Sequence, residues 1–148
     1  MNAATQDPVG AKTAAEKMRV RAGIRAYHHR VPAPVLSRLG LPPLELDQTL
    51  DGHFEHIHAF VTTQQQMGSD LPALRDALSA RGSLWLSWPK AGQLDTDLSL
   101  AEVVRIAYDA NLVESTCISI DSTWSALRLT HPIEGRTYRN RHGRLPDR

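Results

Sequence analysis

The sequence predicts an α/β fold, a Rossmann-like three-layer sandwich in which a mainly parallel sheet ends in an antiparallel hairpin. Segments with strand-like and helix-like patterns alternate along the chain, which favours parallel strands joined by helices that cover both faces of the sheet. Two further strand-like segments near the end of the chain are separated only by "DST". A connection this short is typical of an antiparallel hairpin.

The first half of the chain supplies two short helices and two strands. Thr13 and Glu16 stand in capping-box spacing and predict a short entry helix. Residues 23–29, "GIRAYHH", are typical of a first strand, which the prolines of "RVPAP" end. A short helix is then expected around residues 35–39, and a brief second strand near residues 44–46.

The second half alternates more regularly. Leu71, Leu74 and Leu78 recur at offsets of three and four and indicate a helical region, which Gly68 and Pro72 are expected to divide into two pieces. The expected elements are a strand over 54–62, this helical region over 63–80, a strand over 83–88, a helix over 99–111, and the hairpin strands over 112–120 and 124–132.

The length of 148 residues indicates one domain. We expect a flexible N-terminus over residues 1–12, a single Rossmann-like domain over 13–132, and a basic, disordered tail over 133–148, which holds five arginines and two carboxylates. Cys117 is expected to be buried in a strand. No apolar run approaches the ~20 residues of a membrane span, and the start lacks a secretory pattern, so we expect a soluble cytoplasmic protein with no membrane partner.

The carboxyl ends of the parallel strands are the expected place for a ligand. Lys90 follows the strand that contains Trp88, and it is expected to lie opposite Thr62 and Thr63. One ammonium group and two hydroxyl groups could hold an anionic or polar ligand at this edge. The alternative is that Lys90 is an ordinary surface lysine in a turn above a core tryptophan.

A cluster of histidines raises the question of a metal site. His56 and His58 point to the same side of an extended strand, about 7 Å apart. Zinc requires three or four ligands, and a third could come only from His28 or His29 if the first and third strands are neighbours. No cysteine or suitably placed carboxylate is nearby, so the sequence favours neutral, hydrogen-bonded imidazoles under a helix, and we expect no metal.

The turn after the first strand argues against a conventional nucleotide or S-adenosylmethionine (AdoMet) site. Such a site normally uses a glycine-rich turn, because only glycine lets the backbone approach the ligand closely. The corresponding stretch, "HHRVPAP", contains no glycine. Signatures of the common hydrolases, metalloenzymes and P-loop proteins are also absent, so no cofactor is expected.

The segments "FEHIHAFVT", "GSLWLSWPKAG" and "ISIDSTWSALRL", with others between residues 14 and 130, resemble a family of small bacterial proteins known only as a domain of unknown function, number three thousand and fifty-two. The resemblance implies a trimmed Rossmann-like domain of the AdoMet-methyltransferase type without its glycine-rich loop. It implies no catalytic residues. The family tends to have apolar residues where this chain has His56 and His58.

Two functions of different classes follow. The preferred one is a non-catalytic module that binds a protein partner or a small ligand at the strand-end edge. The alternative is a degenerate or unconventional AdoMet-methyltransferase-like enzyme, so catalytic activity is left open. A weaker alternative is contact of the arginine-rich tail with nucleic acid.

Overall fold

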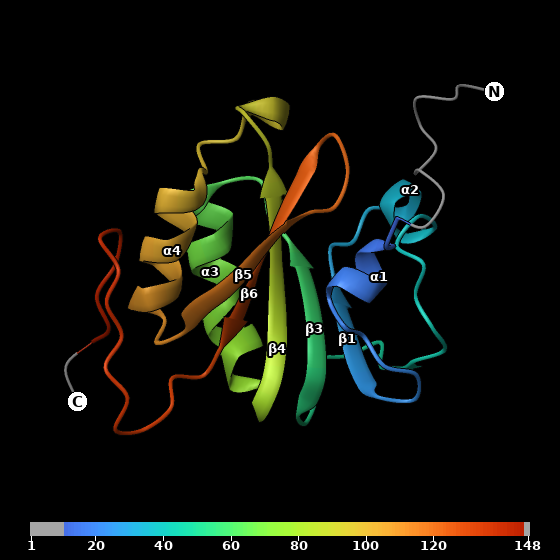
Figure 1. Ribbon diagram of the computed structural model, residues 1–148, viewed down its shortest axis with the longest axis horizontal. Coiled ribbons are helices and arrows are strands. Elements are labelled where there is room, and N and C mark those ends of the chain that lie inside the picture. Colours follow the sequence, from blue (N-terminus) through green and yellow to red (C-terminus); the bar gives the residue numbers. More distant parts are fainter. Residues whose placement is uncertain (1–10, 147–148) are drawn as a thin grey trace.

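The structure is a computed structural model that describes residues 11–146, and its centre is a six-stranded sheet (Figure 1). Most of the predicted flexible N-terminus, residues 1–10, lies outside the described part. The elements in chain order are α1 (Ala14–Lys17), β1 (Arg25–His29), α2 (Ala33–Leu36), β2 (Glu45–Leu46), β3 (Phe54–Phe60), α3 (Gln64–Asp76), β4 (Leu78–Pro89), the 3-10 helix η2 (Gln93–Asp95), α4 (Leu100–Asp109), β5 (Val113–Ser119) and β6 (Trp124–Thr130).

The strands are arranged in the order β2-β1-β3-β4-β6-β5. The first four are parallel, whereas β6 runs antiparallel to both of its neighbours, β4 and β5. The predicted fold class, a mainly parallel sheet that ends in an antiparallel hairpin, is confirmed. From β1 the chain proceeds outward to β2 and then returns to place β3 on the other side of β1. The direction of winding therefore reverses between β1 and β3, which in open α/β sheets marks the ligand crevice.

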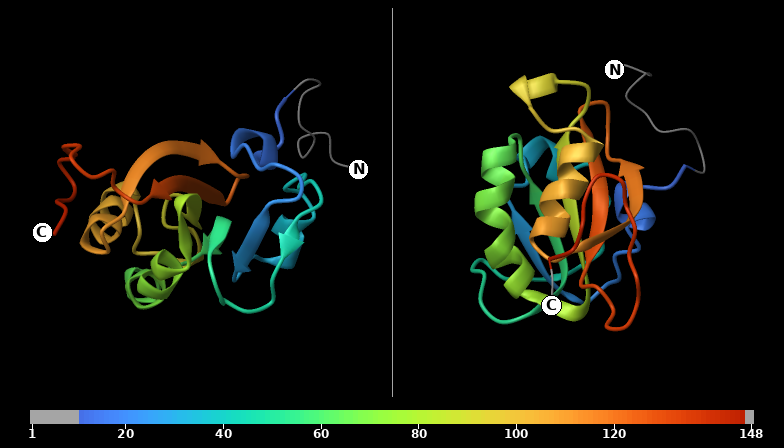
Figure 2. Two further views of the ribbon diagram at one scale, coloured as in Figure 1. Left: turned by 90° about the horizontal axis from the view of Figure 1, so that it is seen from below. Right: turned by 90° about the vertical axis from the view of Figure 1, so that its left-hand side faces the viewer.

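Helices lie on both faces of the sheet (Figure 2). One face packs against α3 and α4, and its core includes Ile57, Leu71 and Val103. The other face packs against α1 and α2 around Met18 and Trp85. The two faces follow from the alternation of side chains along each strand, which sends Ile57 to one core and the flanking histidines to the other.

Local sequence signals explain where the helices begin. Both predicted capping boxes are present: Thr13 with Glu16 at the start of α1, and Ser99 with Glu102 at the start of α4. In each pair the two side chains satisfy N–H groups that the first helical turn leaves free.

The region over 63–80 differs from the sequence prediction in two respects. Helix α3 is continuous through Pro72, because the buried residues Met67, Leu71 and Leu74 hold it against the sheet. Leu78 was expected in the helix but begins β4, where it pairs with Phe54. Leu78 still faces the core, so its spacing predicted the burial correctly and the element wrongly.

Two peripheral segments also differ from expectation. Cys117 is exposed rather than buried, because it lies on β5, the edge strand of the sheet. Residues 133–146, expected to be disordered, run beside α4 (Figure 1). Tyr138 and Leu145 pack against the core, and Asn140 Nδ2 donates to Glu114 Oε1 at 3.0 Å. No helix in residues 11–146 is both long enough and apolar enough to cross a bilayer.

Candidate functional site

The strand-end edge contains the residues that the sequence analysis singled out, but Lys90 turns away from the two threonines. Its Nζ donates to Ser119 Oγ and to the carbonyl oxygen of Asp121. The Lys90 backbone N–H donates to the carbonyl oxygen of Thr123. Lys90 is thus hydrogen-bonded to the turn between β5 and β6 and connects that turn to the end of β4.

Thr62 and Thr63 organise the start of α3. Thr63 is the N-cap of this helix, and its hydroxyl accepts a hydrogen bond from the Gln66 N–H at 3.1 Å. The Gln66 side chain accepts one from the Thr62 N–H at 2.8 Å, and the Thr62 carbonyl accepts one from the hydroxyl of Thr96. Trp88 lies in the core against the α3 and α4 layer. A ligand role for these residues and Lys90 stays a prediction.

The turn after β1 is closed by side chains. His29 Nε2 lies 2.8 Å and Arg30 Nε 3.0 Å from Asp70 Oδ2, which belongs to α3. Partial burial opposes the ionisation of Asp70, but the hydrogen bonds from His29 and Arg30 outweigh it and lower the pKa of this carboxyl group. Arg30 has a φ of 58°, a left-handed conformation that is rare for residues other than glycine. An ion-paired arginine thus occupies the position where a nucleotide-binding turn would have a glycine.

Three of the four candidate histidines share the other face of the sheet. His28 of β1 lies directly opposite His58 of β3 in the parallel register. The ring centroids of His28 and His56 are 6.3 Å apart, and those of His56 and His58 are also 6.3 Å apart. His28 therefore supplies the third member of the row, whereas His29 points to Asp70.

Burial determines the protonation of this row. His58 Nε2 lies 2.7 Å from Ser87 Oγ, but His58 Nδ1, His56 Nε2 and His28 Nε2 have no hydrogen-bond partner among the described residues. Burial lowers the pKa of all three rings, to about 4 for His56. The predicted hydrogen bonding thus holds for His58 and not for His56 Nε2. Within residues 11–146, no group of histidine, cysteine or acidic residues is arranged to hold a metal.

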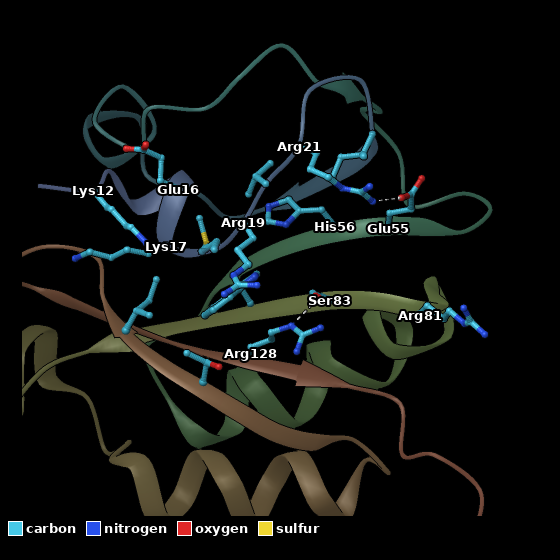
Figure 3. Close-up of a pocket in the computed structure, with 16 residues that line it drawn as sticks. Lys12, Glu16, Lys17, Arg19, Arg21, Glu55, His56, Arg81, Ser83 and Arg128 are labelled. Carbon is cyan, nitrogen blue, oxygen red and sulfur yellow. Dashed lines mark hydrogen bonds and ion pairs between the residues drawn. The ribbon is translucent and has the colours of Figure 1, made fainter. Parts of the chain in front are cut away.

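A basic groove that the sequence analysis did not predict lies on this same face, between the α1 segment and the sheet (Figure 3). Its volume is about 710 Å³. The lining includes six basic side chains and two carboxylates, together with His56, Trp85 and Ser83; the charged residues are Lys12, Lys17, Arg19, Arg21, Arg81, Arg128, Glu16 and Glu55. The one available sequence signal was the density of cations in "KTAAEKMRVR", residues 12–21.

Similarity to solved structures places the fold in a known class. The chain superposes on ribosomal protein L11 methylase from Lactobacillus delbrueckii subsp. bulgaricus with a TM-score of 0.54 and 12% sequence identity, over 80% of this chain and 74% of that one. It also matches magnesium protoporphyrin IX methyltransferase from Synechocystis PCC 6803 with bound SAH, with a TM-score of 0.51 and 10% identity, over 80% and 78% of the two chains. The chain has a methyltransferase-like Rossmann fold.

A third match of the same kind is a TehB-like SAM-dependent methyltransferase from Corynebacterium glutamicum, with a TM-score of 0.50 and 10% identity, over 79% of this chain and 85% of that one. No protein-family model matches the sequence, and no curated protein matches it. Membership of the domain-of-unknown-function family therefore stays a prediction.

The residues at the strand-end edge do not fit a conventional AdoMet cradle. The turn from His29 to Pro32 contains no glycine, and a close approach of its backbone to a ligand is obstructed by the side chains of His29 and Arg30, which Asp70 holds in place. The methyltransferase-like fold is thus present without the turn that usually accompanies it.

Proposed function

We propose that the protein is a degenerate methyltransferase-like domain, which binds a small molecule without a conventional AdoMet cradle. The proposal rests on one combination: the sheet resembles that of methyltransferases, but the turn after β1 is blocked by side chains. The six-stranded sheet with its covering helices superposes on solved methyltransferases with TM-scores of up to 0.54. The turn after β1 is closed by the hydrogen bond between Asp70 and His29 and by the ion pair between Asp70 and Arg30.

An unconventional enzyme that still uses AdoMet is the second candidate. Its support is the likeness to solved methyltransferases, one of which contains bound SAH. Such an enzyme would hold the ligand beyond the ends of β1 and β3, where the winding of the sheet reverses. The Thr62 and Thr63 hydroxyls would be the polar groups at that edge, and Lys90 would have to release Ser119 and Asp121 to join them. The sequence identities of 10% and 12% to these methyltransferase structures support the fold and not the reaction.

Calorimetric titration of the protein with AdoMet, and separately with its demethylated product, tests the proposal. We expect no detectable heat at micromolar to low millimolar ligand, because the closed turn leaves no backbone approach for the adenosyl group. A dissociation constant in the micromolar range would contradict the proposal and favour the unconventional enzyme.

A pair of variants assigns the site if heat is observed. Lys90→Gln removes the cation at the strand-end edge, whereas Arg75→Gln removes a cation at the end of α3, on the opposite edge of the sheet. A loss of AdoMet affinity in Lys90→Gln alone would place the ligand beyond β4. Equal affinities in both variants would exclude Lys90 from the site.

A further inference from the structure

We propose that the basic groove between α1 and the sheet binds a small molecule that carries two or more phosphate groups. The proposal concerns the face of the sheet opposite α3 and α4, and it does not depend on any ligand at the strand-end edge. Phosphate is a group that clustered guanidinium and ammonium groups bind well, because a guanidinium can donate two parallel hydrogen bonds to two phosphate oxygens.

The charge of the groove is unbalanced. Of its six cations, Arg21 pairs with Glu55 at 3.5 Å, and the second carboxylate, Glu16, is held in the capping box of α1. Lys12, Lys17, Arg19, Arg81 and Arg128 form no ion pair with any carboxylate of residues 11–146; they line the groove together. Concentrated positive charge on a partly enclosed wall attracts a multiply charged anion.

Arg128 on the sheet and Arg19 after α1 approach the groove from different elements. Arg128 Nε donates to Ser83 Oγ at 2.8 Å and its Nη1 donates to Ser115 Oγ at 3.3 Å, which leaves Nη2 without a hydrogen-bond partner among the described residues (Figure 3). Arg19 follows α1 with a φ of 58°, an unusual conformation that turns the chain sharply at this point. Figure 3 shows Arg19 extending from the end of α1 toward the sheet. The two cations therefore approach the groove from opposite walls.

Unpartnered polar atoms at the base of the groove supply an observation independent of charge. Trp85 is 2% exposed and His56 is 3% exposed, and both line the groove. The Trp85 Nε1–H and the His56 Nε2 have no hydrogen-bond partner among the described residues. Buried polar groups are nearly always paired, so the orphaned indole N–H beside this cationic cavity is a free donor for which a ligand oxygen is a suitable acceptor.

The depth of these atoms favours a small molecule over a nucleic acid. A duplex presents its phosphates along an extended backbone and would contact the exposed cations at the rim of the groove, such as Lys12 and Arg81. It would not reach the nearly buried Trp85. A compact phosphate ester can enter a cavity of about 710 Å³ and contact both walls.

Heteronuclear NMR and calorimetry test the proposal on the full chain. The three tryptophans give three indole N–H signals, and Trp85→Phe identifies one of them. Titration with inorganic tripolyphosphate should shift the Trp85 signal and leave those of Trp88 and Trp124 in place. Affinity should rise from phosphate to pyrophosphate to tripolyphosphate and fall with added salt.

Two double variants that remove the same charge distinguish binding in the groove from non-specific electrostatic attraction. Arg19→Asn with Arg128→Gln removes two groove cations, and asparagine tolerates the left-handed conformation at position 19. Arg75→Gln with Arg105→Gln removes two cations outside the groove and serves as the matched control. We expect the first pair to weaken tripolyphosphate binding at least about tenfold and the second less than about twofold. Equal effects of the two pairs would overturn the proposal.

Two further outcomes would also contradict it. Citrate binding as tight as that of pyrophosphate would show that the groove does not select phosphate. Tighter binding of a short DNA duplex, with no shift of the Trp85 indole signal, would show a surface that attracts nucleic acid instead.

The variant Trp85→Phe tests the proposal even if Arg19→Asn with Arg128→Gln folds poorly. It removes the buried donor without a change of charge and should weaken tripolyphosphate binding severalfold. Unchanged affinity in a folded Trp85→Phe variant would count against the proposal.

Discussion

His28 of β1 and His56 of β3 lie on one face of the sheet with ring centroids 6.3 Å apart, and the buried Nε2 of each lacks a partner among residues 11–146. The His58 ring extends the row, and the basic groove adjoins it at His56. Protonation of any ring would place a charge beside neutral imidazoles and groove cations with little water to solvate it. Burial consequently favours the neutral form of all three rings.

Acid should therefore destabilise the fold through His56. Burial, and secondarily the nearby His28, lower the pKa of His56 to about 4, whereas an unfolded histidine titrates near 6.5. Between these values the unfolded state binds more protons, so the free energy of unfolding falls as the pH falls from about 6.5 to about 4. At pH 5 the loss from His56 alone is roughly 2 kcal/mol.

Urea denaturation of the natural chain and of His56→Gln at pH 7.5, 6 and 5 measures this effect. The variant should lose less stability than the natural chain between pH 7.5 and pH 5, whatever its stability at neutral pH. Arg128 and Arg19, which also face the groove, keep their charge over the whole range and so cancel from the comparison. Parallel pH profiles for the two proteins would show that His56 is not the group responsible.

The same histidines should not form a zinc site. Zinc requires three or four ligands around one point, and within residues 11–146 no group of three or more histidine, cysteine or acidic residues is arranged to hold a metal. We expect zinc to leave the thermal midpoint of the untagged protein unchanged and elemental analysis to show no stoichiometric metal. Binding at 100-fold the dissociation constant would add about 2.7 kcal/mol, so the assay is sensitive. A bound equivalent that is lost in the double variant His56→Ala, His58→Ala would contradict this expectation.

Ser87 should be important for stability because it provides the hydrogen bond of a fully buried imidazole. His58 is 0% exposed and Ser87 is 0% exposed, and their contact at 2.7 Å is the only one that satisfies a ring nitrogen of His58 within the described part of the chain. Ser87→Ala should cost about 1–3 kcal/mol, as expected when a buried polar group loses its partner.

A double-mutant cycle distinguishes the hydrogen bond from packing. In the His58→Phe background, Ser87→Ala no longer orphans a ring nitrogen and should cost clearly less than in the natural chain. Chemical denaturation of the four proteins gives the coupling energy. A coupling energy near zero would mean that the hydroxyl group contributes by packing alone.

Local sequence patterns predicted the features that depend on residues a few positions away. They did not predict the features that form where segments distant in sequence meet. The capping boxes at Thr13 and Ser99 depend on residues three positions away and were found as expected. The direction of Lys90 depends on where the β5–β6 turn lies, and alternation along one strand carries no information on that. The groove combines residues 12–21 with Arg81 and Arg128, which only the pairing of β4 with β6 brings together.

Two glycines should respond in opposite ways to the same substitution. A Cβ atom at Gly82 would lie 2.8 Å from the carbonyl oxygen of Phe54 and 3.1 Å from that of Glu55, where backbone cannot easily move. Gly82→Ala should therefore destabilise the protein by about 1–3 kcal/mol. A Cβ atom at Gly68, within α3, meets nothing within 4 Å, so Gly68→Ala should stabilise by up to about 1 kcal/mol.

Thermal melts of the two alanine variants beside the natural chain check both signs at once. The register of β3 and β4 shifts near Phe54, which is why the backbones come so close at Gly82. A neutral Gly82→Ala would imply that β3 and β4 can separate there at little cost.

The segment after β6 should stabilise the domain, and its arginines should be dispensable for that role. Tyr138 and Leu145 pack on the core, and the Tyr138 hydroxyl accepts a hydrogen bond from the Ile133 N–H at 2.9 Å. Removal of residues 133–148 should lower the free energy of unfolding by about 1–3 kcal/mol through loss of this apolar contact. A variant with Arg136, Arg139 and Arg141 changed to glutamine keeps the contact and should unfold at the same temperature as the natural chain.

The same triple variant tests the nucleic-acid alternative without the instability of the truncation, because each lost phosphate contact reduces the salt dependence of binding. We expect its salt-dependent retention of DNA and RNA to equal that of the natural chain; a flatter salt dependence would show that these arginines do contact phosphates.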